Sequence, residues 1–406
     1  MSTTTTKKNI PELRFPGFFG EWQEMVVGNF LNERKEYSIK GKGLKHVSLT
    51  TKGVVSKSRR YDRDFLVRND EEKSYKVTRM NDLCYNPANL KFGVISINKL
   101  GDGIFSPIYI TYEIEKQDID FIGYLLTQNK FINKARKFEQ GTVYERMAVH
   151  PNDFENVQVF LPKIKEQEKI AIFLGSADSL LENLRKEKQK LEEYKRGMMQ
   201  KIFSQEVRFK NENGKDFPKW KEVPLKEVLK KRSVRNNNSE YKNVLTNSAQ
   251  YGIVNQSEYF SKDIANQDNL TNYYVVETDD FIYNPRISKF APVGPFKRNK
   301  NGRGIMSPLY TILKLSKGNL SFYEYYFDTN LWHRYMFKIS NFGARHDRMN
   351  IRGEDFMKMP IPFPDTKEQE KIASFLIAID KLISMKAEQV KNAETWKKGL
   401  LQKMFV

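Results

Sequence analysis

Hydrophobic residues recur at alternating steps of three and four, or at whole multiples of these steps, in two segments of the chain. Such spacing places one apolar stripe along an α-helix, and a sustained stripe forms a heptad seam. The first stripe consists of Ile170, Leu174, Ala177, Leu181, Leu184, Leu191, Met198 and Ile202, and the second consists of Ile372, Leu376, Ile379, Ile383, Val390, Ala393, Leu400 and Met404. The residues that interrupt these stripes are Lys188, Lys195, Lys386 and Lys397. The pattern predicts two long helices, each about 57 Å long for roughly 38 residues at ~1.5 Å per residue.

The two predicted helices carry nearly the same sequence. Residues 165–171, KEQEKIA, return 202 positions later as residues 367–373, and the register then holds without a gap to the end of both segments. Each stripe alone fits an ordinary helix packed on a core as well as it fits a helix pair, but two matched stripes favour pairing of the helices with each other. A repeat of this length predicts two copies of one structural unit, with near two-fold symmetry inside a single chain.

The segments that precede the helices diverge more but share a frame of turns and aromatic residues. The shared landmarks are Phe15, Trp22, Tyr85-Asn86-Pro87, Lys91-Phe92 and Tyr109 in the first segment, and Phe217, Trp220, Tyr283-Asn284-Pro285, Lys289-Phe290 and Tyr310 in the second. Short β-rich runs broken by Asn-Pro and Gly turns predict mixed α/β domains. The predicted organisation is a disordered tail at 1–11, a globular domain at 12–162, a helix at 163–203, a linker at 204–216, a second domain at 217–362 and a second helix at 363–406.

Composition narrows the class of protein. The chain of 406 residues has a formal net charge of +19, which indicates a polyanionic partner. Its one cysteine, Cys84, excludes an intramolecular disulfide and every Cys-based zinc motif, and it suits a reducing cytoplasm. No apolar run reaches the length of a membrane span, and the N-terminus lacks the apolar core of a signal peptide. We therefore expect a cytoplasmic protein without a membrane partner.

The positive charge is concentrated in the globular segments. Residues 165–203 hold 9 Lys or Arg against 7 Asp or Glu, and residues 365–406 hold 8 against 6. By contrast, each domain has one acid-free basic run, which consists of Lys40, Lys42, Lys45, Lys52, Lys57, Arg59 and Arg60 in the first and of Arg286, Lys289, Lys297, Arg298, Lys300 and Arg303 in the second. Such runs neutralise phosphates, and arginine can also read base edges. A solvated basic face is the alternative, but one run in each domain favours nucleic acid.

Further basic residues lie beside the shared landmarks. Lys91 follows the Asn-Pro turn of the first domain, and the stretches 141–146 and 343–348 resemble loops that end in a shared arginine, Arg146 or Arg348, with Arg345 close to the second. These residues complete the set of predicted DNA ligands. The shared arginine fits a phosphate ligand or a structural ion pair equally well, so both interpretations stay open.

Motifs for catalysis are lacking. The chain has no glycine-rich nucleotide loop ending in Gly-Lys-Ser or Gly-Lys-Thr. The two Tyr-Asn-Pro sequences lack the second proline and the aromatic residue of an amino-methyltransferase motif, so turns are the better interpretation. The four histidines show no paired metal-ligand spacing. A nuclease-like Glu71-Glu72-Lys73 arises easily by chance in a chain with 29% charged residues. The sequence predicts a protein that reads DNA, with no catalytic or metal-binding residues.

This architecture resembles the specificity subunit of type I restriction–modification enzymes. The motif Pro-x-x-x-Glu-Gln-x-Lys-Ile-Ala at 162–171 and 364–373 is typical of that family, as is the Phe-Pro…Trp opening of each domain. The resemblance covers nearly the whole chain from Phe15 onwards. It implies an α/β fold in which two target recognition domains alternate with two helices that pair as an antiparallel coiled coil, with a pseudo-two-fold internal repeat.

The resemblance also implies the function and the partners. Each domain would read one half of a bipartite, asymmetric site in double-stranded DNA, and the helices would fix the spacer between the half-sites. Two methyltransferase subunits that use S-adenosylmethionine would dock on the chain, and two restriction/translocase subunits that use ATP and Mg would join them, while this chain binds no cofactor itself. We expect the docking residues at the repeated helix starts, namely Glu166, Gln167, Glu168, Glu368, Gln369 and Glu370. The alternatives are a non-specific basic DNA-binding scaffold and a stand-alone DNA nuclease or modification enzyme with an unrecognised active site.

Overall fold

The chain divides into two compact units, each of which combines one globular domain with parts of both long helices. The computed structural model describes residues 9–39, 43–57, 73–140, 147–237, 239–259, 267–340 and 347–406. Unit 1 comprises residues 1–185 and 388–406, and unit 2 comprises residues 186–387. Each unit is described by itself. No helix in these described ranges is long and apolar enough to cross a membrane.

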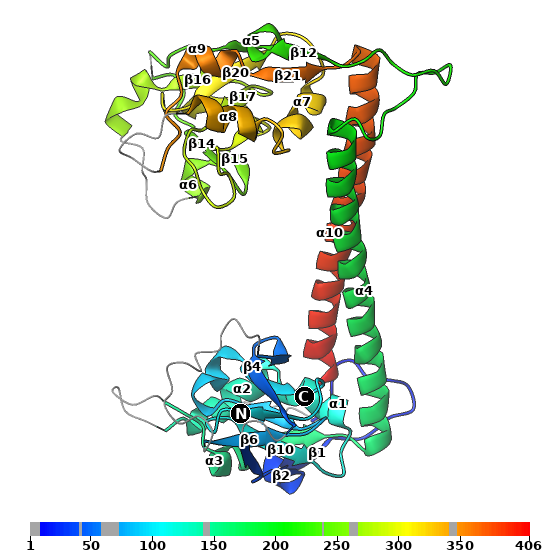
Figure 1. Ribbon diagram of the computed structural model, residues 1–406. Helices are drawn as coiled ribbons and strands as arrows, with labels where there is room; N and C mark the ends of the chain where they lie inside the picture. The colour runs from blue at the N-terminus through cyan, green and yellow to red at the C-terminus, as the bar shows by residue number, and fades with distance from the viewer. Residues whose placement is uncertain are drawn as a thin grey trace, which may run out of the picture. The chain divides into compact units, whose positions relative to one another are not determined.

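The two long helices predicted from the apolar stripes are helices α4 (Ile164–Phe203) and α10 (Thr366–Met404). In unit 1, Asp178 of α4 forms an ion pair with Lys397 of α10, and Arg185 pairs with Glu394 at 2.6 Å. Because the residue number rises along α4 while it falls along α10, the two helical segments of this unit run antiparallel. Figure 1 shows α4 and α10 in green and red.

The helical segments of unit 2 pair in the same way. Lys195 of α4 lies 2.7 Å from Asp380 of α10, and Lys386 lies 2.7 Å from Glu187, so these segments are antiparallel as well. Three of the lysines that interrupt the apolar stripes, Lys195, Lys386 and Lys397, are thus partners of carboxylates on the facing helix. The fourth, Lys188, pairs with Glu192 one turn further along its own helix.

The described globular part of unit 1 consists of three sheets and three short α-helices (Figure 1). Its strands are β1 (Gln23–Val26), β2 (Leu31–Glu33), β3 (Tyr37–Ile39), β4 (Lys45–Thr50), β5 (Gly53–Ser56), β6 (Ser74–Thr78), β7 (Leu83–Tyr85), β8 (Ile95–Ile97), β9 (Gly103–Phe105), β10 (Ile110–Ile114) and β11 (Gln158–Leu161). Its short α-helices are α1 (Ile119–Leu126), α2 (Asn129–Ala135) and α3 (Pro151–Glu155). The strand orders are β1-β11, β2-β10-β7-β8 and β3-β6-β9-β4-β5. The third sheet contains the parallel pair β4 and β9.

Unit 2 repeats this organisation. Its strands are β12 (Lys221–Pro224), β13 (Leu229–Lys231), β14 (Leu245–Ser248), β15 (Gly252–Asn255), β16 (Tyr274–Val276), β17 (Phe281–Tyr283), β18 (Phe296–Arg298), β19 (Gly304–Met306), β20 (Thr311–Leu315) and β21 (Pro360–Phe363). Its short α-helices are α5 (Leu225–Val228), α6 (Gln256–Tyr259), α7 (Leu320–Phe327), α8 (His333–Ile339) and α9 (Gly353–Met357). The orders β12-β21 and β13-β20-β17-β18 match the first two sheets of unit 1. Val244, directly before β14, forms a parallel bridge with Ile305 of β19, which corresponds to the parallel pairing of β4 with β9.

The repeated glutamine after each helix start explains how the long helices attach to the domains. Asp118 caps α1 by accepting a hydrogen bond from the Phe121 amide at 2.8 Å, and the Gln167 side-chain carbonyl accepts the Asp118 amide at 3.1 Å. In unit 2, Asn319 caps α7 and its amide donates to Gln369 at 2.9 Å. The glutamine of the long helix therefore satisfies a backbone donor at the start of a second helix, which orients the two helices.

The ends of the long helices are part of the globular cores. In unit 1, Leu174 of α4 and Phe405 after α10 belong to the same buried cluster, where the Phe405 ring packs on Trp22. In unit 2, Phe203 of α4 and Leu376 of α10 share one cluster. Both interpretations of the apolar stripes therefore apply. Each helix packs on a core at its ends, and within each unit it is ion-paired with the other helix.

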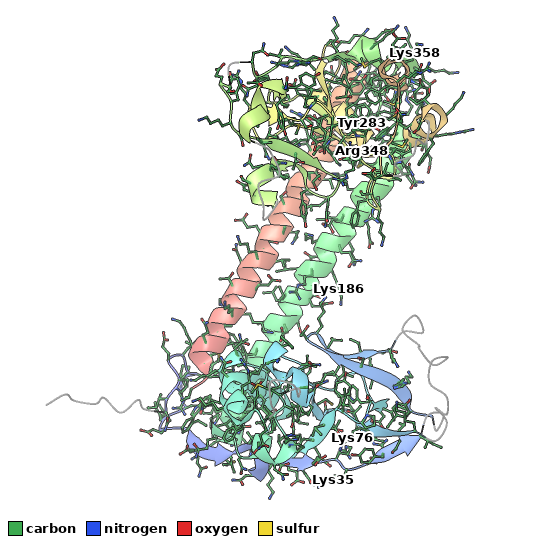
Figure 2. The ribbon with its side chains drawn as sticks, turned by 90° about the vertical axis from the view of Figure 1, so that its left-hand side faces the viewer. Lys35, Lys76, Lys186, Tyr283, Arg348 and Lys358 are labelled. Atoms are coloured by element: carbon green, nitrogen blue, oxygen red, sulfur yellow. The ribbon has the colours of Figure 1, made fainter. Side chains whose placement is uncertain are left out.

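One basic residue is wholly internal. Lys76 of β6 is buried inside unit 1, where its ammonium lies 2.8 Å from a Glu33 carboxylate oxygen and 5.1 Å from the centre of the Tyr37 ring (Figure 2). A buried charge is tolerated when it is paired in this way. Lys76 therefore serves the fold of the domain and not its surface charge.

Candidate nucleic-acid interface

Both Tyr-Asn-Pro sequences are turns, as predicted. The Asn284 side-chain oxygen accepts the Arg286 amide at 3.0 Å, and the Asn86 side-chain oxygen accepts the amides of Ala88 and Asn89. The asparagine thus closes a local turn through its own side chain. In unit 2 the preceding residue, Tyr283, anchors the turn because it is buried and donates its hydroxyl to the Val293 carbonyl at 2.8 Å; burial raises the pKa of this phenol.

The turn of unit 2 lies against the segment that contains Arg348. The Met349 amide donates to the Pro285 carbonyl at 2.8 Å, and the Ile287 amide donates to the Asp347 carbonyl at 3.0 Å. These two bonds form an antiparallel bridge between Arg286 and Arg348. Residues that face each other in such a bridge point to the same side of the backbone, so the two arginines are neighbours.

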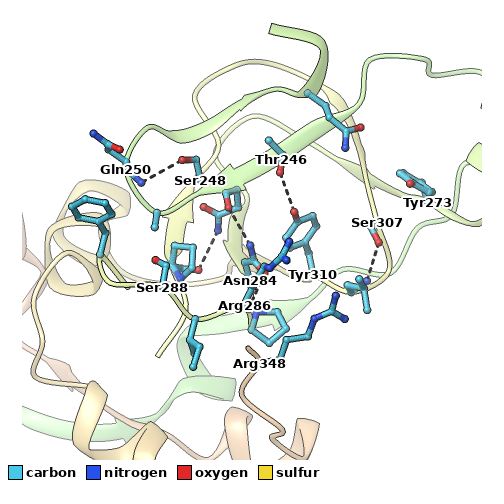
Figure 3. Close-up of a pocket in the computed structure, with 18 residues that line it drawn as sticks. Thr246, Ser248, Gln250, Tyr273, Asn284, Arg286, Ser288, Ser307, Tyr310 and Arg348 are labelled. Atoms are coloured by element: carbon cyan, nitrogen blue, oxygen red, sulfur yellow. Dashed lines mark hydrogen bonds between the residues drawn. The ribbon is translucent and has the colours of Figure 1, made fainter. Parts of the chain in front are cut away.

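The two arginines line a hollow of about 610 Å³ in unit 2 (Figure 3). Its polar lining includes Thr246, Asn247, Ser248, Gln250, Gln256, Asn284, Ser288, Ser307 and Tyr310, and its apolar lining includes Phe290 and Leu309. The hydroxyls of Thr246 and Tyr310, which both line the hollow, are hydrogen-bonded at 3.0 Å. Hydroxyl, amide and guanidinium groups are the side chains that contact DNA in most protein–DNA complexes.

The charge at the rim of this hollow is positive. The Arg286 side chain is 67% exposed and the Arg348 side chain 35% exposed, and each Nε atom lies 3.8 Å from the same Asp347 carboxylate. One carboxylate thus faces two guanidinium groups at the long limit of an ion pair. The three side chains together keep one net positive charge, which can attract a phosphate or an acceptor-rich base edge.

The rest of the basic run in unit 2 is not an acid-free surface, which corrects the interpretation from sequence. Lys297 lies 2.5 Å from Asp328, Arg298 lies 2.6 Å from Asp279, and Lys300 lies 2.5 Å from Glu324. Arg303 lies 2.7 Å from Glu277, which raises the pKa of the guanidinium. Carboxylates from distant parts of the chain offset four of the six charges. Of the other two, Lys289 is exposed next to the hollow-lining Phe290, and Arg286 lines the hollow.

The basic run of unit 1 is only partly described. Lys45 and Lys52 are exposed on the β4–β5 hairpin and Lys57 is half-buried after β5, while Lys91 is exposed on the 3-10 helix η4 (Pro87–Phe92). The remaining predicted ligands Lys40, Lys42, Arg59, Arg60 and Arg146, and Arg345 of unit 2, lie outside the described residues. For these residues, DNA binding remains a prediction from the sequence.

The structure corrects the equivalence of Arg146 and Arg348. The backbone amide that bonds to the turn proline is that of Met349 in unit 2 and that of Val149 in unit 1. The structural counterpart of Arg348 is therefore Ala148, two residues after Arg146. The apparent Arg-Met echo was a coincidence of spacing, because unit 2 has two more residues than unit 1 between this bridge and the buried Phe356 or Phe154.

Side chains suitable for a metal ion do not gather in the described part of the chain: no group of three or more His, Cys, Asp or Glu residues there could hold one. Cys84 is buried in unit 1, and this burial raises the pKa of its thiol to about 12.

Comparisons with known proteins bear on the family. The family model described as "Type I restriction modification DNA specificity domain" matches residues 218–394. The matched residues include the globular domain of unit 2. The chain is 27% identical to the putative type I restriction enzyme MjaX specificity subunit of Methanocaldococcus jannaschii, over 66% of this chain and 64% of that protein. It is 26% identical to the MjaVIII specificity subunit of the same organism, over 61% of each. The chain thus spans less than two thirds of the length of these relatives.

Solved structures share the fold of the chain. The S subunit of a type I restriction–modification system from M. genitalium has a TM-score of 0.55 and 13% identity, covering 98% of this chain and 99% of its own. A chain of another type I system has a TM-score of 0.53 and 17% identity, covering 97% and 99%. The predicted α/β fold and the stated resemblance to specificity subunits are therefore confirmed.

The start of helix α10 has an intramolecular role in unit 2, which the prediction of a docking surface did not include. Glu368 is fully buried, and its carboxylate accepts hydrogen bonds from Arg208 at 2.7 and 3.0 Å and from the Trp220 indole at 2.9 Å. Its counterpart Glu166 is buried against Arg14 at 2.8 Å. The hydrogen bonds to Glu368 raise the pKa of the Arg208 guanidinium.

Gln167 and Gln369 are likewise buried, and their side-chain carbonyls accept the backbone amides of the residues that cap α1 and α7. These four predicted docking residues thus hold each long helix to its own domain. Their repetition is explained by this structural role, and a docking role for them stays a prediction. Glu168 and Glu370 are exposed, and their docking role stays a prediction.

Several hollow-lining residues of unit 2 were missed from the sequence, namely Thr246, Ser248, Gln250 and Tyr273. They are uncharged, so a search for basic runs does not select them. The only sequence signal is the polar stretch 246–250 directly after a hydrophobic residue.

Proposed function

We propose that this chain is the DNA sequence-specificity subunit of a type I restriction–modification complex. Each unit reads one half of a bipartite, asymmetric site in double-stranded DNA. The chain contributes recognition and no catalysis, and it acts in the cytoplasm. The hollow in unit 2, with its two arginines and its hydroxyl and amide lining, supports DNA as the ligand of that unit.

The observation that carries this proposal is that the two units share one structural framework but differ in their surface residues. In each unit a tyrosine of a short helix, Tyr124 of α1 or Tyr325 of α7, donates its hydroxyl to the aspartate of a long helix, at 2.6 or 2.7 Å. In each unit the same aspartate pairs with a lysine of the other long helix. By contrast, the exposed Arg286 at the hollow of unit 2 has the counterpart Ala88 in unit 1, each of which follows an Asn-Pro turn. Two modules with a common frame and different recognition surfaces suit two different half-sites.

The helices have the dimensions and the surface for spacing and docking. A helix of 40 residues such as α4 extends about 60 Å at ~1.5 Å per residue, which suits a ruler between two readers. Exposed apolar side chains repeat along the helices: unit 1 has Leu180 and Trp396, and unit 2 has their sequence counterparts Leu382 and Tyr194. Because solvent-exposed aromatic and aliphatic side chains favour protein contacts, each unit offers an equivalent surface for one methyltransferase subunit.

The remaining partners follow from the same assignment. Two methyltransferase subunits would bring S-adenosylmethionine, and two restriction/translocase subunits would bring ATP and Mg. This chain would hold none of these cofactors and would position the partners on DNA.

The experiment that tests the proposal is selection from randomised duplexes. The full chain is purified in complex with its methyltransferase subunit, and DNA retained after washing is sequenced. We expect two short conserved blocks separated by a gap of fixed length and no sequence preference. Retention of DNA without any preferred sequence would instead establish a non-specific basic scaffold, and DNA cleavage or modification by the chain alone would establish a stand-alone enzyme.

The docking part of the proposal is tested separately by surface substitutions. We expect Leu180→Glu with Leu382→Glu to weaken binding of methyltransferase subunits, because a charge then lies in an apolar contact. Gln189→Glu is the matched control: it is exposed nine residues beyond Leu180, about two and a half turns at ~3.6 residues per turn, on the opposite side of α4. Equal binding of both variants, measured by calorimetry or co-purification, would remove this surface from the proposal.

A further inference from the structure

Arg286 and Arg348 are held as a pair by the backbone of unit 2. They face each other in an antiparallel bridge that is fixed on both sides by hydrogen bonds of the Pro285 and Asp347 carbonyls. The Asn284 side chain closes the turn under Arg286, and it also donates to the Asn247 carbonyl at 3.1 Å on the neighbouring strand β14. The main-chain structure therefore fixes the spacing of the two backbone positions from which the arginine side chains extend.

The surroundings of the pair match a sugar–phosphate backbone better than a base edge. The hollow is concave, and the phosphate ridge of a DNA strand is convex, whereas base edges lie at the floor of a groove that a protruding element must enter. Hydroxyl and amide side chains line the hollow beside the arginines, which are the usual ligands of phosphate and sugar oxygens. Phe290, 69% exposed, and Leu309, 57% exposed, offer apolar contacts for deoxyribose.

The equivalent positions of unit 1 do not carry this pair. Ala88 follows the Asn86-Pro87 turn where Arg286 follows the second turn, and its amide bonds to the asparagine in the same way. Ala148 precedes the residue that bonds to the turn proline, as Arg348 does in unit 2. Both arginines of unit 2 thus correspond to alanines in unit 1, where Ala88 lies in the 3-10 helix η4 and Ala148 forms its bridge with Gln140.

We propose that Arg286 and Arg348 form a phosphate clamp that holds one DNA strand at the half-site contacted by unit 2, and that unit 1 has no clamp at the equivalent position. This inference rests on the proposed function and adds the ligand class of the hollow. The clamp positions the DNA and supplies affinity but carries no sequence preference, so base reading is done by other residues.

The test uses the full chain in complex with its methyltransferase subunits and a duplex that contains the selected site. Dissociation constants of the wild type and of Arg286→Ala/Arg348→Ala are measured over a range of salt concentrations. Each phosphate contact contributes a slope of about −0.9 in log K against log salt, so we expect the slope to become less negative by roughly 1.8. We also expect equal loss of affinity for specific and random duplexes, and an unchanged selected sequence.

The matched control removes two exposed cations of the same unit that do not line the hollow. Lys317 lies 3.4 Å from a carboxylate, and Lys358, labelled in Figure 2, lies 3.6 Å from another. The two arginines lie 3.8 Å from theirs. Lys317→Ala/Lys358→Ala therefore reproduces the change in net charge without the clamp. A second variant, Arg286→Lys/Arg348→Lys, keeps the charge and should restore most of the slope, and melting curves establish that each variant is folded.

Two results would overturn the clamp. A slope equal to that of the lysine control would mean that the arginines do not contact phosphates. A selected sequence that loses its preference at one position of one half-site would mean that the arginines read a base. Both results require a wild-type complex that binds a defined site; absence of any preferred sequence in the wild type would refute the proposed function instead.

Discussion

Replacing Glu368 by glutamine separates a structural role of the repeated helix start from a docking role. The Glu368 carboxylate is fully buried at the start of α10 and accepts three hydrogen bonds, two from Arg208 and one from Trp220. An amide in its place removes the negative charge and directs an N–H group at one of these donors. The Arg208 side chain, 22% exposed, would then lose its charged partner, and outside residue 368 it would keep one acceptor, the Pro218 carbonyl at 2.8 Å.

The size of the effect follows from this burial. Breaking a buried ion pair by removing one partner costs about 3 to 5 kcal/mol. Because Arg208 is partly exposed and keeps one acceptor, we expect the lower end, about 3 kcal/mol. For a unit of this size 1 kcal/mol shifts the melting temperature by about 2 to 4 °C, so the expected fall is roughly 6 to 12 °C. Glu370→Gln, two residues further along and exposed, should change the stability by less than about 0.5 kcal/mol.

The assay is thermal unfolding of both variants beside the wild type, followed by binding of the methyltransferase subunit below the melting temperature. We expect Glu368→Gln to lower the melting temperature while the folded variant still binds its partner. The reasoning would be refuted if Glu368→Gln and Glu370→Gln unfolded like the wild type and only Glu368→Gln lost the partner. That result would mean that the buried carboxylate becomes accessible for docking.

Three further predictions concern single side chains. Because burial raises the pKa of the Cys84 thiol to about 12, the thiol is protonated at neutral pH, and we expect an aromatic disulfide reagent to label it slowly in the native chain and rapidly in guanidinium; rapid native labelling would contradict its burial. Gly175 lies inside α4 with open space around its would-be Cβ, so Gly175→Ala should raise the free energy of unfolding by about 0.5 to 1 kcal/mol in a denaturant titration, and a loss of stability would show that the site is not helical in solution. Tyr325→Phe removes the 2.7 Å hydrogen bond to Asp380 and should cost about 1 kcal/mol in the same titration; an unchanged midpoint would show that this contact does not hold α7 to α10.

The long helices could be predicted because their signal is local and repeated. An apolar residue every three or four positions over some forty residues matches the period of a helix and not that of a strand, and the structure has helices at Ile164–Phe203 and Thr366–Met404. The partners of the interrupting lysines could not be predicted. Lys397 pairs with Asp178, 219 positions away in sequence, and only the antiparallel arrangement brings the two together.

The candidate site could be predicted only in part, because a run of basic residues in the sequence does not show which of their charges are offset by nearby carboxylates in the fold. Arg298 and Lys300 belong to an acid-free run, yet strand pairing and helix packing bring Asp279 and Glu324 next to them. Arg286 was found from the same run, and it does line the hollow. The polar lining of the hollow gave no comparable signal, since hydroxyl and amide side chains occur on every surface.

Sequence repeats also proved an imperfect guide to structural equivalence. The matching Arg-Met pairs suggested that Arg146 and Arg348 occupy the same position, but the backbone bonds to the two turn prolines identify Ala148 as the counterpart of Arg348. Two extra residues between Met349 and Phe356 displace the register. Burial agrees with the hydrogen bonds, because Met147 is 43% exposed whereas Val149 and Met349 are both buried.

The most direct test of the central claim is the methylome of cells that carry this chain with a cognate methyltransferase subunit, compared with cells that carry the methyltransferase alone. The account predicts a new N6-methyladenine mark in a split motif, with two short half-sites around a gap of fixed length. Exchange of residues 217–362 for those of a relative should then change one half-site and leave the other and the gap unchanged. No new mark from a verified complex, or a change of both half-sites on exchange, would contradict the claim that each unit reads its own half of the site.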